Sequence, residues 1–238
     1  MSVRVAMWSG PRNISTALMR AWENRPDTVV VDEPLYAAYL ARTGIDHPGR
    51  DAVIASQPTD LDEVVRSLHA PLPEGVHVQY AKHMTHHLED GSDLGWTRAF
   101  RNVLLIRDPA EVVASYVRSR ESCEPEDIGI VQQVRLVEAW SDPPPVIDAG
   151  DFLRAPETYL RWLCTWLGIE FDDRMLSWPA GPRSTDGVWA PYWYDGVWAS
   201  TGFEPWRPRS VDLSPHDERV AAACRPAYDV LHAARLRL

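Results

Sequence analysis

Short apolar runs alternate along the chain with segments whose apolar positions recur every three or four residues. Such runs are typical of buried strands, whereas the three-to-four period indicates amphipathic helices. Strands are predicted at Val3–Trp8, Thr28–Val31, Val76–Tyr80, Asn102–Ile106 and Val146–Asp148. Helices are predicted at Ile14–Asn24, Leu61–Leu68, Ala110–Arg120, Ile128–Trp140, Pro156–Leu167 and about Pro215–Leu236. The alternation indicates βα units and an α/β fold with a mostly parallel central sheet flanked by helices.

Three turn-rich segments interrupt this pattern. Arg42–Thr59 and Ser122–Asp127 are predicted to be surface loops. Gly181–Arg209 also has many turn residues, but it carries the large rings of Trp189, Tyr192, Trp193, Tyr194, Trp198, Phe203 and Trp206. A mobile linker would not hold so many apolar rings, so this segment is predicted to fold back over the domain. The rings form either part of the core or an apolar pocket for a ligand. At 238 residues the chain fits one domain, residues 1–238.

Composition limits the classes of partner. The net charge of -10 disfavours general attraction to nucleic acid or to an anionic membrane, so an anionic ligand must be met by local arginines. Because no leader, long apolar run or lipidation signal is recognised, we expect a cytoplasmic, soluble protein. We expect a monomer or a homodimer, because these are common assembly states of soluble proteins.

Among 24 Lys and Arg residues there is a single lysine, Lys82, which points to a special need for an ammonium group there.

The start of the chain has the pattern of a phosphate-binding loop. The predicted first strand is followed by a loop that leads into the first helix, with the residues Gly10, Pro11, Arg12, Asn13, Ile14, Ser15 and Thr16. Free N–H groups and the positive dipole end at a helix start favour bound anions. The nucleoside-triphosphate loop G-x-x-x-x-G-K-[ST] is not matched, because Thr16 and Ala17 stand where its lysine and metal-binding hydroxyl belong. Arg12 supplies a cation instead, which favours a phosphate-bearing donor handled without magnesium; the alternative is an ordinary βα turn.

A second arginine follows the fourth predicted strand. Arg107 ends this strand, Asp108 and Pro109 open the next helix, and Ser115 lies about two turns along it. The Arg and Ser side chains are placed to hold one phosphate from two sides. The alternative is that Arg107 simply pairs with a carboxylate.

Together, these two stretches resemble the PAPS-dependent sulfotransferases, especially the bacterial and tyrosine-sulfating branch. The loop S-G-P-R-N-I-S-T-A-L-M-R resembles the family's 5′-phosphosulfate loop, and L-L-I-R-D-P-A-E-V-V-A-S-Y resembles its 3′-phosphate motif. The resemblance extends to Val146–Met175 and implies a P-loop-type domain. It implies that the loop Gly10–Thr16 binds the 5′-phosphosulfate of PAPS, and that Arg107 and Ser115 bind its 3′-phosphate.

The resemblance also implies a late loop over the adenosine and a product, PAP (adenosine 3′,5′-bisphosphate). Gly181-Pro-Arg183 followed by Asp186-Gly187-Val188-Trp189 is the candidate equivalent, with Arg183 as its remaining basic residue. No metal is required by this reading. The acceptor is expected to be a small molecule.

Chemistry requires a base for the acceptor and a cation for the leaving phosphate. Lys82, placed just beyond the third predicted strand, is the candidate cation. If the chain turns helical there, His86 shares its face and is a candidate base. Glu33, at the end of the second strand, is the rival base and resembles a glutamate of the tyrosine-sulfating branch. His83 and His87 are predicted to be solvated.

Three functions are weighed. The leading one is a sulfotransferase that moves a sulfuryl group from PAPS to a hydroxyl or amine of a small molecule. A P-loop kinase or ATPase is the second, because Asp32-Glu33 resembles the acidic strand end that holds magnesium in an ATPase. A non-catalytic PAP-binding protein is the third.

Overall fold

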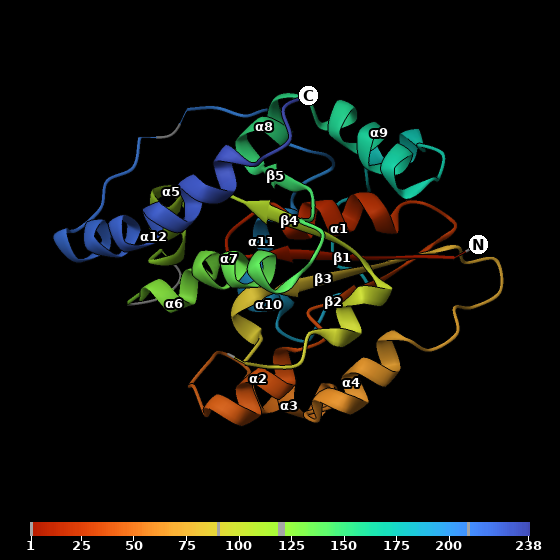
Figure 1. The fold of residues 1–238 in the computed structure, drawn as a ribbon, viewed down its shortest axis with the longest axis horizontal. Coiled ribbons are helices and arrows are strands. Elements are labelled where there is room, and N and C mark those ends of the chain that lie inside the picture. Colours follow the sequence, from red (N-terminus) through yellow and green to blue (C-terminus); the bar gives the residue numbers. More distant parts are fainter. Residues whose placement is uncertain (1, 90, 119–121, 209) are drawn as a thin grey trace.

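A parallel β-sheet forms the centre of the structure (Figure 1), a computed structural model that describes residues 2–89, 91–118, 122–208 and 210–238. Its strands are β1 (Val3–Ser9), β2 (Thr28–Asp32), β3 (Val78–Met84), β4 (Arg101–Ile106) and β5 (Val146–Asp148). They lie in the order β2-β3-β1-β4-β5, and each neighbouring pair is parallel. The predicted α/β fold with a parallel central sheet is confirmed.

One predicted strand is displaced along the sequence. The prediction placed the third strand at Val76–Tyr80, whereas β3 runs from Val78 to Met84, so Lys82 and His83 lie inside the sheet. Every residue of β3 is buried. A lysine within a buried strand looks like a strand end in the sequence, because its burial depends on partners from elsewhere in the chain.

The predicted helices are all found, with ends that differ by a few residues. They are α1 (Ser15–Glu23), α4 (Leu61–Leu68), α5 (Pro109–Tyr116), α7 (Ile130–Ala139), α9 (Pro156–Leu167) and α12 (Pro215–Ala233). The predicted end of the helix Ala110–Arg120 lies outside the described residues, and so does Arg209, the predicted end of the aromatic segment. Shorter helical elements are α2 (Tyr36–Thr43), α3 (Arg50–Ser56), α6 (Pro125–Ile128), α8 (Ala149–Arg154), α10 (Ala190–Trp193), α11 (Asp195–Trp198), η1 (Thr85–His87), η2 (Gly95–Ala99) and η3 (Asp173–Leu176).

Two predicted loops are therefore wrong in part. Arg42–Thr59 contains α3, and Ser122–Asp127 contains the start of α6. The helix α3 has only Val53 fully buried, in a cluster with the α2 residue Leu40. With one buried position, α3 shows too little periodicity to be recognised as a helix in the sequence. Its conformation depends on tertiary packing.

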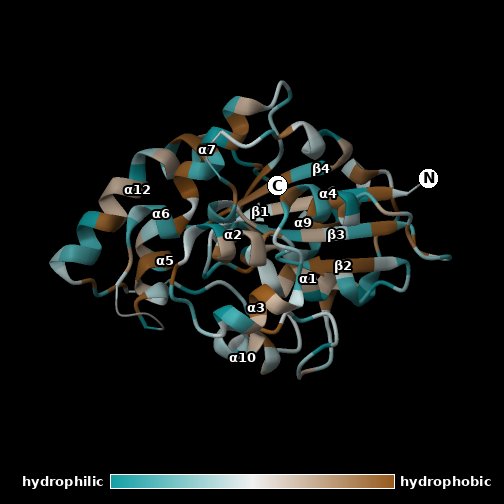
Figure 2. Cartoon of the chain, turned by 90° about the horizontal axis from the view of Figure 1, so that it is seen from below, coloured by the Kyte–Doolittle hydropathy of each residue, from teal (hydrophilic) through white to brown (hydrophobic). Residues whose placement is uncertain are grey.

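Alternate residues of the strands face two different helical layers. On β1, Val5 and Met7 pack with the helices α1 and α9, whereas Ala6 and Trp8 pack with α4, α5, α7 and α12. This division requires strands that are apolar on both faces, and β2 is correspondingly coloured as hydrophobic over most of its length in Figure 2. The two layers leave the carboxyl ends of the strands as the edge where ligands bind in such sheets.

The aromatic segment folds back as predicted. Trp189 and Tyr194 are buried against Tyr36 and Leu40 of α2, which forms a third apolar cluster beside the sheet. Tyr192 is 52% exposed, so the rings of this segment do not all share one environment. The segment thereby brings Tyr194 to the end of β3. Among the helices of the described chain, none combines the length and the apolar character that crossing a bilayer requires.

Candidate functional site

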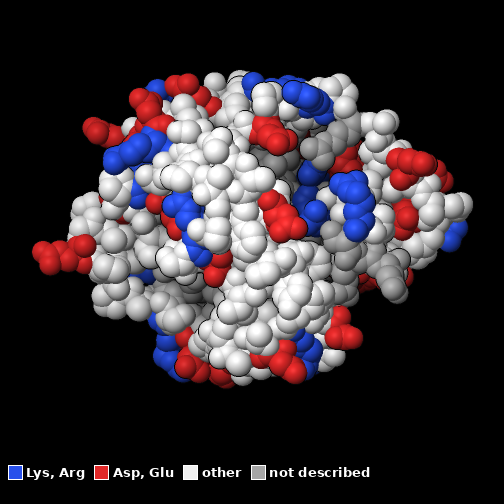
Figure 3. Space-filling model, turned by 180° about the vertical axis from the view of Figure 1, so that it is seen from behind, with Lys and Arg blue, Asp and Glu red and all other residues white. Residues whose placement is uncertain are grey.

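A cavity of about 1160 Å³ opens at the carboxyl ends of the strands. The loop residues Pro11 to Ala17 form one wall, and Glu33, Lys82 and His86 form another. Arg107 and Ser115 line the same cavity, as do residues 148–151 at the end of β5 and the start of α8. The sheet order places β1 between β3 and β4, which explains why these separate motifs converge. Figure 3 shows Lys and Arg side chains gathered beside a recess on the face opposite that of Figure 1.

The loop after β1 is held in a fixed shape. Gly10 packs so closely on α6 that a Cβ atom there would lie 2.1 Å from the carbonyl oxygen of Ile128. Arg12 has a φ angle of 54°, in the left-handed region that non-glycine residues rarely adopt. Among the described residues, no side chain caps the start of α1. The first-turn N–H groups of α1 are consequently available for an anion in the cavity.

The two predicted phosphate motifs meet directly. Arg12 Nε donates a hydrogen bond to Ser115 Oγ at 3.1 Å, and Arg107 Nη1 donates to the carbonyl oxygen of Arg12 at 2.8 Å. Arg107 also pairs with Glu111, with Nη2 and Oε2 2.9 Å apart. Burial lowers the pKa of Arg12, and the charges of Arg118 and Arg107 lower it further. Like charges gathered in this way favour a bound polyanion.

The lysine on β3 is surrounded by acidic and phenolic oxygens. Lys82 Nζ lies 2.9 Å from Asp32 Oδ1, 2.6 Å from Glu33 Oε1 and 2.5 Å from the hydroxyl oxygen of Tyr194. Asp32 and Lys82 face each other in the β2–β3 register. The backbone of Glu33 has a φ angle of 41°, and its N–H donates to the Lys82 carbonyl oxygen at 2.9 Å. Strain in a residue fixed by these contacts is typical of functional sites.

Burial and the ion pair act in opposite directions on the pKa values of Lys82 and Glu33. Burial alone would lower the pKa of Lys82, but the charges of Asp32 and Glu33 and their hydrogen bonds raise that pKa above its ordinary value. Burial raises the pKa of Glu33, against the opposing charge of Lys82. Lys82 is therefore a permanent cation at neutral pH, and Glu33 is a stronger base than an exposed glutamate.

The histidines after Lys82 differ from expectation. Lys82 belongs to β3 and His86 to η1, so the two do not share a helical face, although both line the cavity. His83 and His87 are buried, not solvated, and His83 stacks on Trp8 with ring centroids 4.2 Å apart. The prediction failed because packing inside the fold, not local polarity, places these rings. Burial lowers the pKa of both His83 and His86 to about 3.

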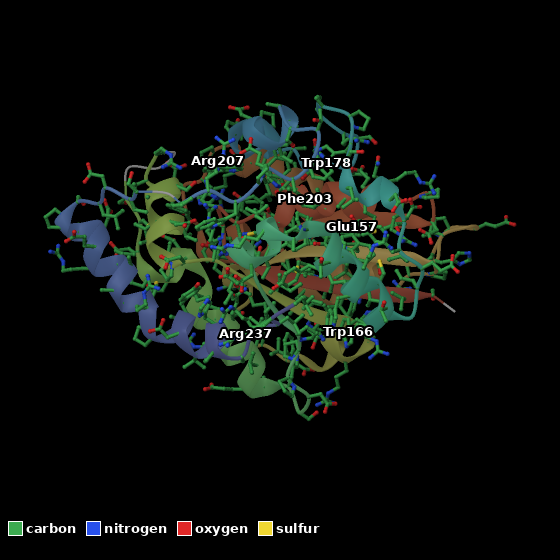
Figure 4. All side chains as sticks on the ribbon, turned by 90° about the horizontal axis from the view of Figure 1, so that it is seen from above. Glu157, Trp166, Trp178, Phe203, Arg207 and Arg237 are labelled. Atoms are coloured by element: carbon green, nitrogen blue, oxygen red, sulfur yellow. The ribbon has the colours of Figure 1, made fainter. Side chains whose placement is uncertain are left out.

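Most of the predicted site residues converge, and Arg183 does not. Pro11, Asn13, Ile14, Ser15 and Thr16 line the cavity, and Gly10 lies behind the loop. Arg183 is absent from the cavity wall; its backbone N–H donates to Asp186 at 2.8 Å. The late segment instead supplies residues 202–208, including Arg207, and Figure 4 shows Phe203 beside Trp178 with Arg207 farther along.

Several residues that line the cavity were not named as site residues from the sequence. They include Asp148, Arg154, Tyr194, Arg207 and Arg235. Arg154 lies over the ring of Trp206, 3.7 Å from its centroid, and Arg235 pairs with Asp151 at 2.7 Å. In the sequence, the acidic turn at the end of β5 and the Trp206-Arg207 pair are the features that indicate the part of the cavity wall formed by these residues.

Comparisons with known proteins find relatives over nearly the whole chain. A family model described as "Sulfotransferase domain" matches residues 3–235. The Arabidopsis thaliana protein named branched-chain-amino-acid aminotransferase-like protein 1 is 38% identical over 232 residues, covering 94% of this chain. The chain spans only 40% of the length of that relative.

Solved structures share the fold. The sulfotransferase domain of a Synechococcus olefin synthase has a TM-score of 0.54 at 16% identity, with 93% of this chain and 94% of that chain covered. A mouse sulfotransferase complexed with PAP has a TM-score of 0.52 at 10% identity, with 98% of this chain and 89% of that chain covered. Both are similar to this chain in the arrangement of the sheet and its helices.

Proposed function

This chain belongs to the sulfotransferase family, and from that premise we propose that it transfers a sulfuryl group from PAPS to a hydroxyl or amine of a small-molecule acceptor. The observation that carries the proposal is the convergence of Arg12, Arg107 and Lys82 on one cavity. Arg12 and Arg107 belong to the two predicted phosphate motifs, which a hydrogen bond joins. Lys82 lies beside the buried carboxylate of Glu33.

The donor end of the cavity suits a nucleotide that is phosphorylated at both ends of its ribose. The uncapped start of α1 and the loop around Arg12 are suited to the 5′-phosphosulfate. Arg107 and Ser115 are suited to the 3′-phosphate, with Ser115 already oriented by Arg12. The PAP complex of the mouse sulfotransferase supports this donor class.

Lys82 and Glu33 supply the charges that the transfer requires. Glu33 removes the proton from the acceptor hydroxyl or amine as the acceptor atom bonds to sulfur. The bond between sulfur and the 5′-phosphate oxygen breaks, and Lys82 and Arg12 stabilise the negative charge that develops on that oxygen. The products are the sulfated acceptor and PAP, and the proton passes from Glu33 to solvent.

Glu33 is the better candidate for the base. Its pKa is raised by burial, toward the range in which a base works near neutral pH. His86 has a pKa of about 3 and so binds a proton only weakly. The Nδ1 atom of His86 has no hydrogen-bond partner among the described residues to fix its tautomer.

A donor and acceptor assay tests the proposal. The purified protein is incubated with PAPS labelled in its sulfate and with a library of phenols, alcohols and amines, and labelled products are counted. Transfer to at least one acceptor without added magnesium is expected. Binding of PAP without transfer to any acceptor would identify a binding protein instead. Turnover of ATP that requires magnesium would favour the kinase or ATPase alternative.

A further inference from the structure

The hydroxyl of Tyr194 has all of its hydrogen-bonding positions filled by neighbouring side chains. It accepts from Lys82 Nζ at 2.5 Å and from Trp189 Nε1 at 3.2 Å, and it donates to Asp32 Oδ2 at 2.7 Å. A hydroxyl offers one proton and two lone pairs, so this set is complete. The ring of Tyr194 also lies under Lys82, with Nζ 4.8 Å from its centroid.

Asp32 completes the support on the side away from the cavity. Its Oδ1 accepts from Lys82, and its Oδ2 accepts from Tyr194 and from the N–H of Gly187 at 3.2 Å. Glu33 lines the cavity, whereas Asp32 does not. Of the two carboxylates on Lys82, Asp32 therefore holds the ammonium from behind, and Glu33 faces the reactants.

We propose that Tyr194 is a positioning residue that, with Asp32, fixes the ammonium of Lys82 in its working place. The inference rests on the role given to Lys82 in the proposed function. The two residues of the late segment that hold Asp32 and Lys82 are Gly187 and Tyr194, so both belong to the segment 187–194. Lys82 is thus fully held only when that segment is docked on the sheet.

One ion pair fixes the residue just before this segment to α1. Asp186 pairs with the buried Arg20 of α1 over 2.5 Å and accepts from Trp198 Nε1 at 3.0 Å. Gly187 passes so close to the Trp189 ring that a Cβ atom would lie 2.1 Å from it. The ring that donates to Tyr194 is thereby held against the backbone of its own segment. Docking and lysine placement are linked through these neighbouring residues.

The variant Tyr194→Phe removes the hydroxyl and keeps the buried ring. Its matched control is Tyr192→Phe, the same change two positions earlier at a side chain that is 52% exposed and does not line the cavity. Because Lys82 is the chain's only lysine, ¹⁵N-lysine labelling gives one side-chain ammonium signal to follow by NMR. This signal needs no acceptor and no turnover.

Tyr194→Phe should shift the ammonium signal and speed the exchange of its protons with water, whereas Tyr192→Phe should change neither. In the transfer assay, Tyr194→Phe should lower kcat by about 10- to 100-fold and leave PAP affinity within about twofold, as expected for a misplaced catalytic cation. Adding Asp32→Asn should cause little further loss, because both residues act through the same lysine.

The outcomes separate the two hypotheses. An unchanged ammonium signal in Tyr194→Phe, or losses that simply multiply in the double variant, would overturn the positioning role. A wild type that transfers no sulfuryl group would contradict the proposed function, while the NMR comparison would still decide whether Tyr194 holds Lys82.

Discussion

Arg12 and Ser115 are 103 positions apart in the sequence, and their side chains share a hydrogen bond of 3.1 Å. The contact joins the loop after β1 to the helix after β4. Arg107 strengthens the same junction through the backbone oxygen of Arg12. A ligand held by one motif therefore lies within reach of the other, which suits a compact molecule with two phosphates.

Replacing Arg107 should weaken donor binding. Arg107→Ala removes a charged group that lines the cavity and that orients the carbonyl of Arg12. A charged hydrogen bond is worth about 1.5–3 kcal/mol, so PAP affinity should fall about ten- to a hundredfold in isothermal titration. Arg66→Ala, at an exposed arginine of α4, is the control. Equal PAP affinity in the two variants would remove Arg107 from the donor site.

The two candidate bases should respond differently to substitution. Glu33→Gln keeps the shape and removes the base, so kcat should fall about 100- to 10,000-fold, while His86→Ala should change it far less. The acidic limb of the kcat/KM profile reports protonation of Glu33, whose pKa is raised by burial. Activity of the wild type should thus decline as the pH falls through that pKa, and Glu33→Gln should lack this limb. A stronger loss in His86→Ala would reverse the assignment.

Removing the lysine should impair both chemistry and stability. Lys82→Ala leaves Asp32 and Glu33 buried without their cation, which typically costs about 3–5 kcal/mol of folding free energy. The unpaired carboxylates bind protons more readily when folded than when unfolded, so the deficit should shrink as the pH falls. Urea unfolding at several pH values measures this trend, and a deficit that grows toward acid contradicts it. Turnover should vanish, with PAP affinity mostly kept.

The sequence predicted those parts of the fold that rest on local pattern. The apolar runs that became β1, β2, β4 and β5 are visible because both faces of these strands are buried. The helices α4 and α9 begin and end where their patterns do, since Asp60 caps α4 and Gly168 ends α9.

The site was harder to predict where it depends on distant contacts. Arg12 and Arg107 were found because their motifs are local. Tyr194 and Arg207 were missed as site residues because nothing near them in the sequence tells which ring or arginine of the late segment reaches the cavity. Lys82 looked like a strand end because its partners, Asp32 and Tyr194, lie 50 and 112 positions away.

A buried histidine outside the cavity should govern acid stability. His83 stacks on Trp8, and neither of its ring nitrogens has a hydrogen-bond partner among the described residues. Burial lowers its pKa to about 3, whereas the unfolded chain takes up the proton near the ordinary value of about 6.5. A depressed folded-state pKa means that stability present above about pH 6.5 is lost as the pH falls toward 3.

His83→Phe keeps the stacked ring and removes the titrating group. Between about pH 6 and pH 4 the variant should lose roughly 1.4 kcal/mol less folding free energy per pH unit than the wild type. Urea unfolding across that range gives the two slopes, and the exposed His77 serves as a control through His77→Phe. Parallel slopes for His83→Phe and the wild type would mean that His83 is protonated in the folded state. The protonated ring of His83 would then have to donate a hydrogen bond to an acceptor beside Trp8.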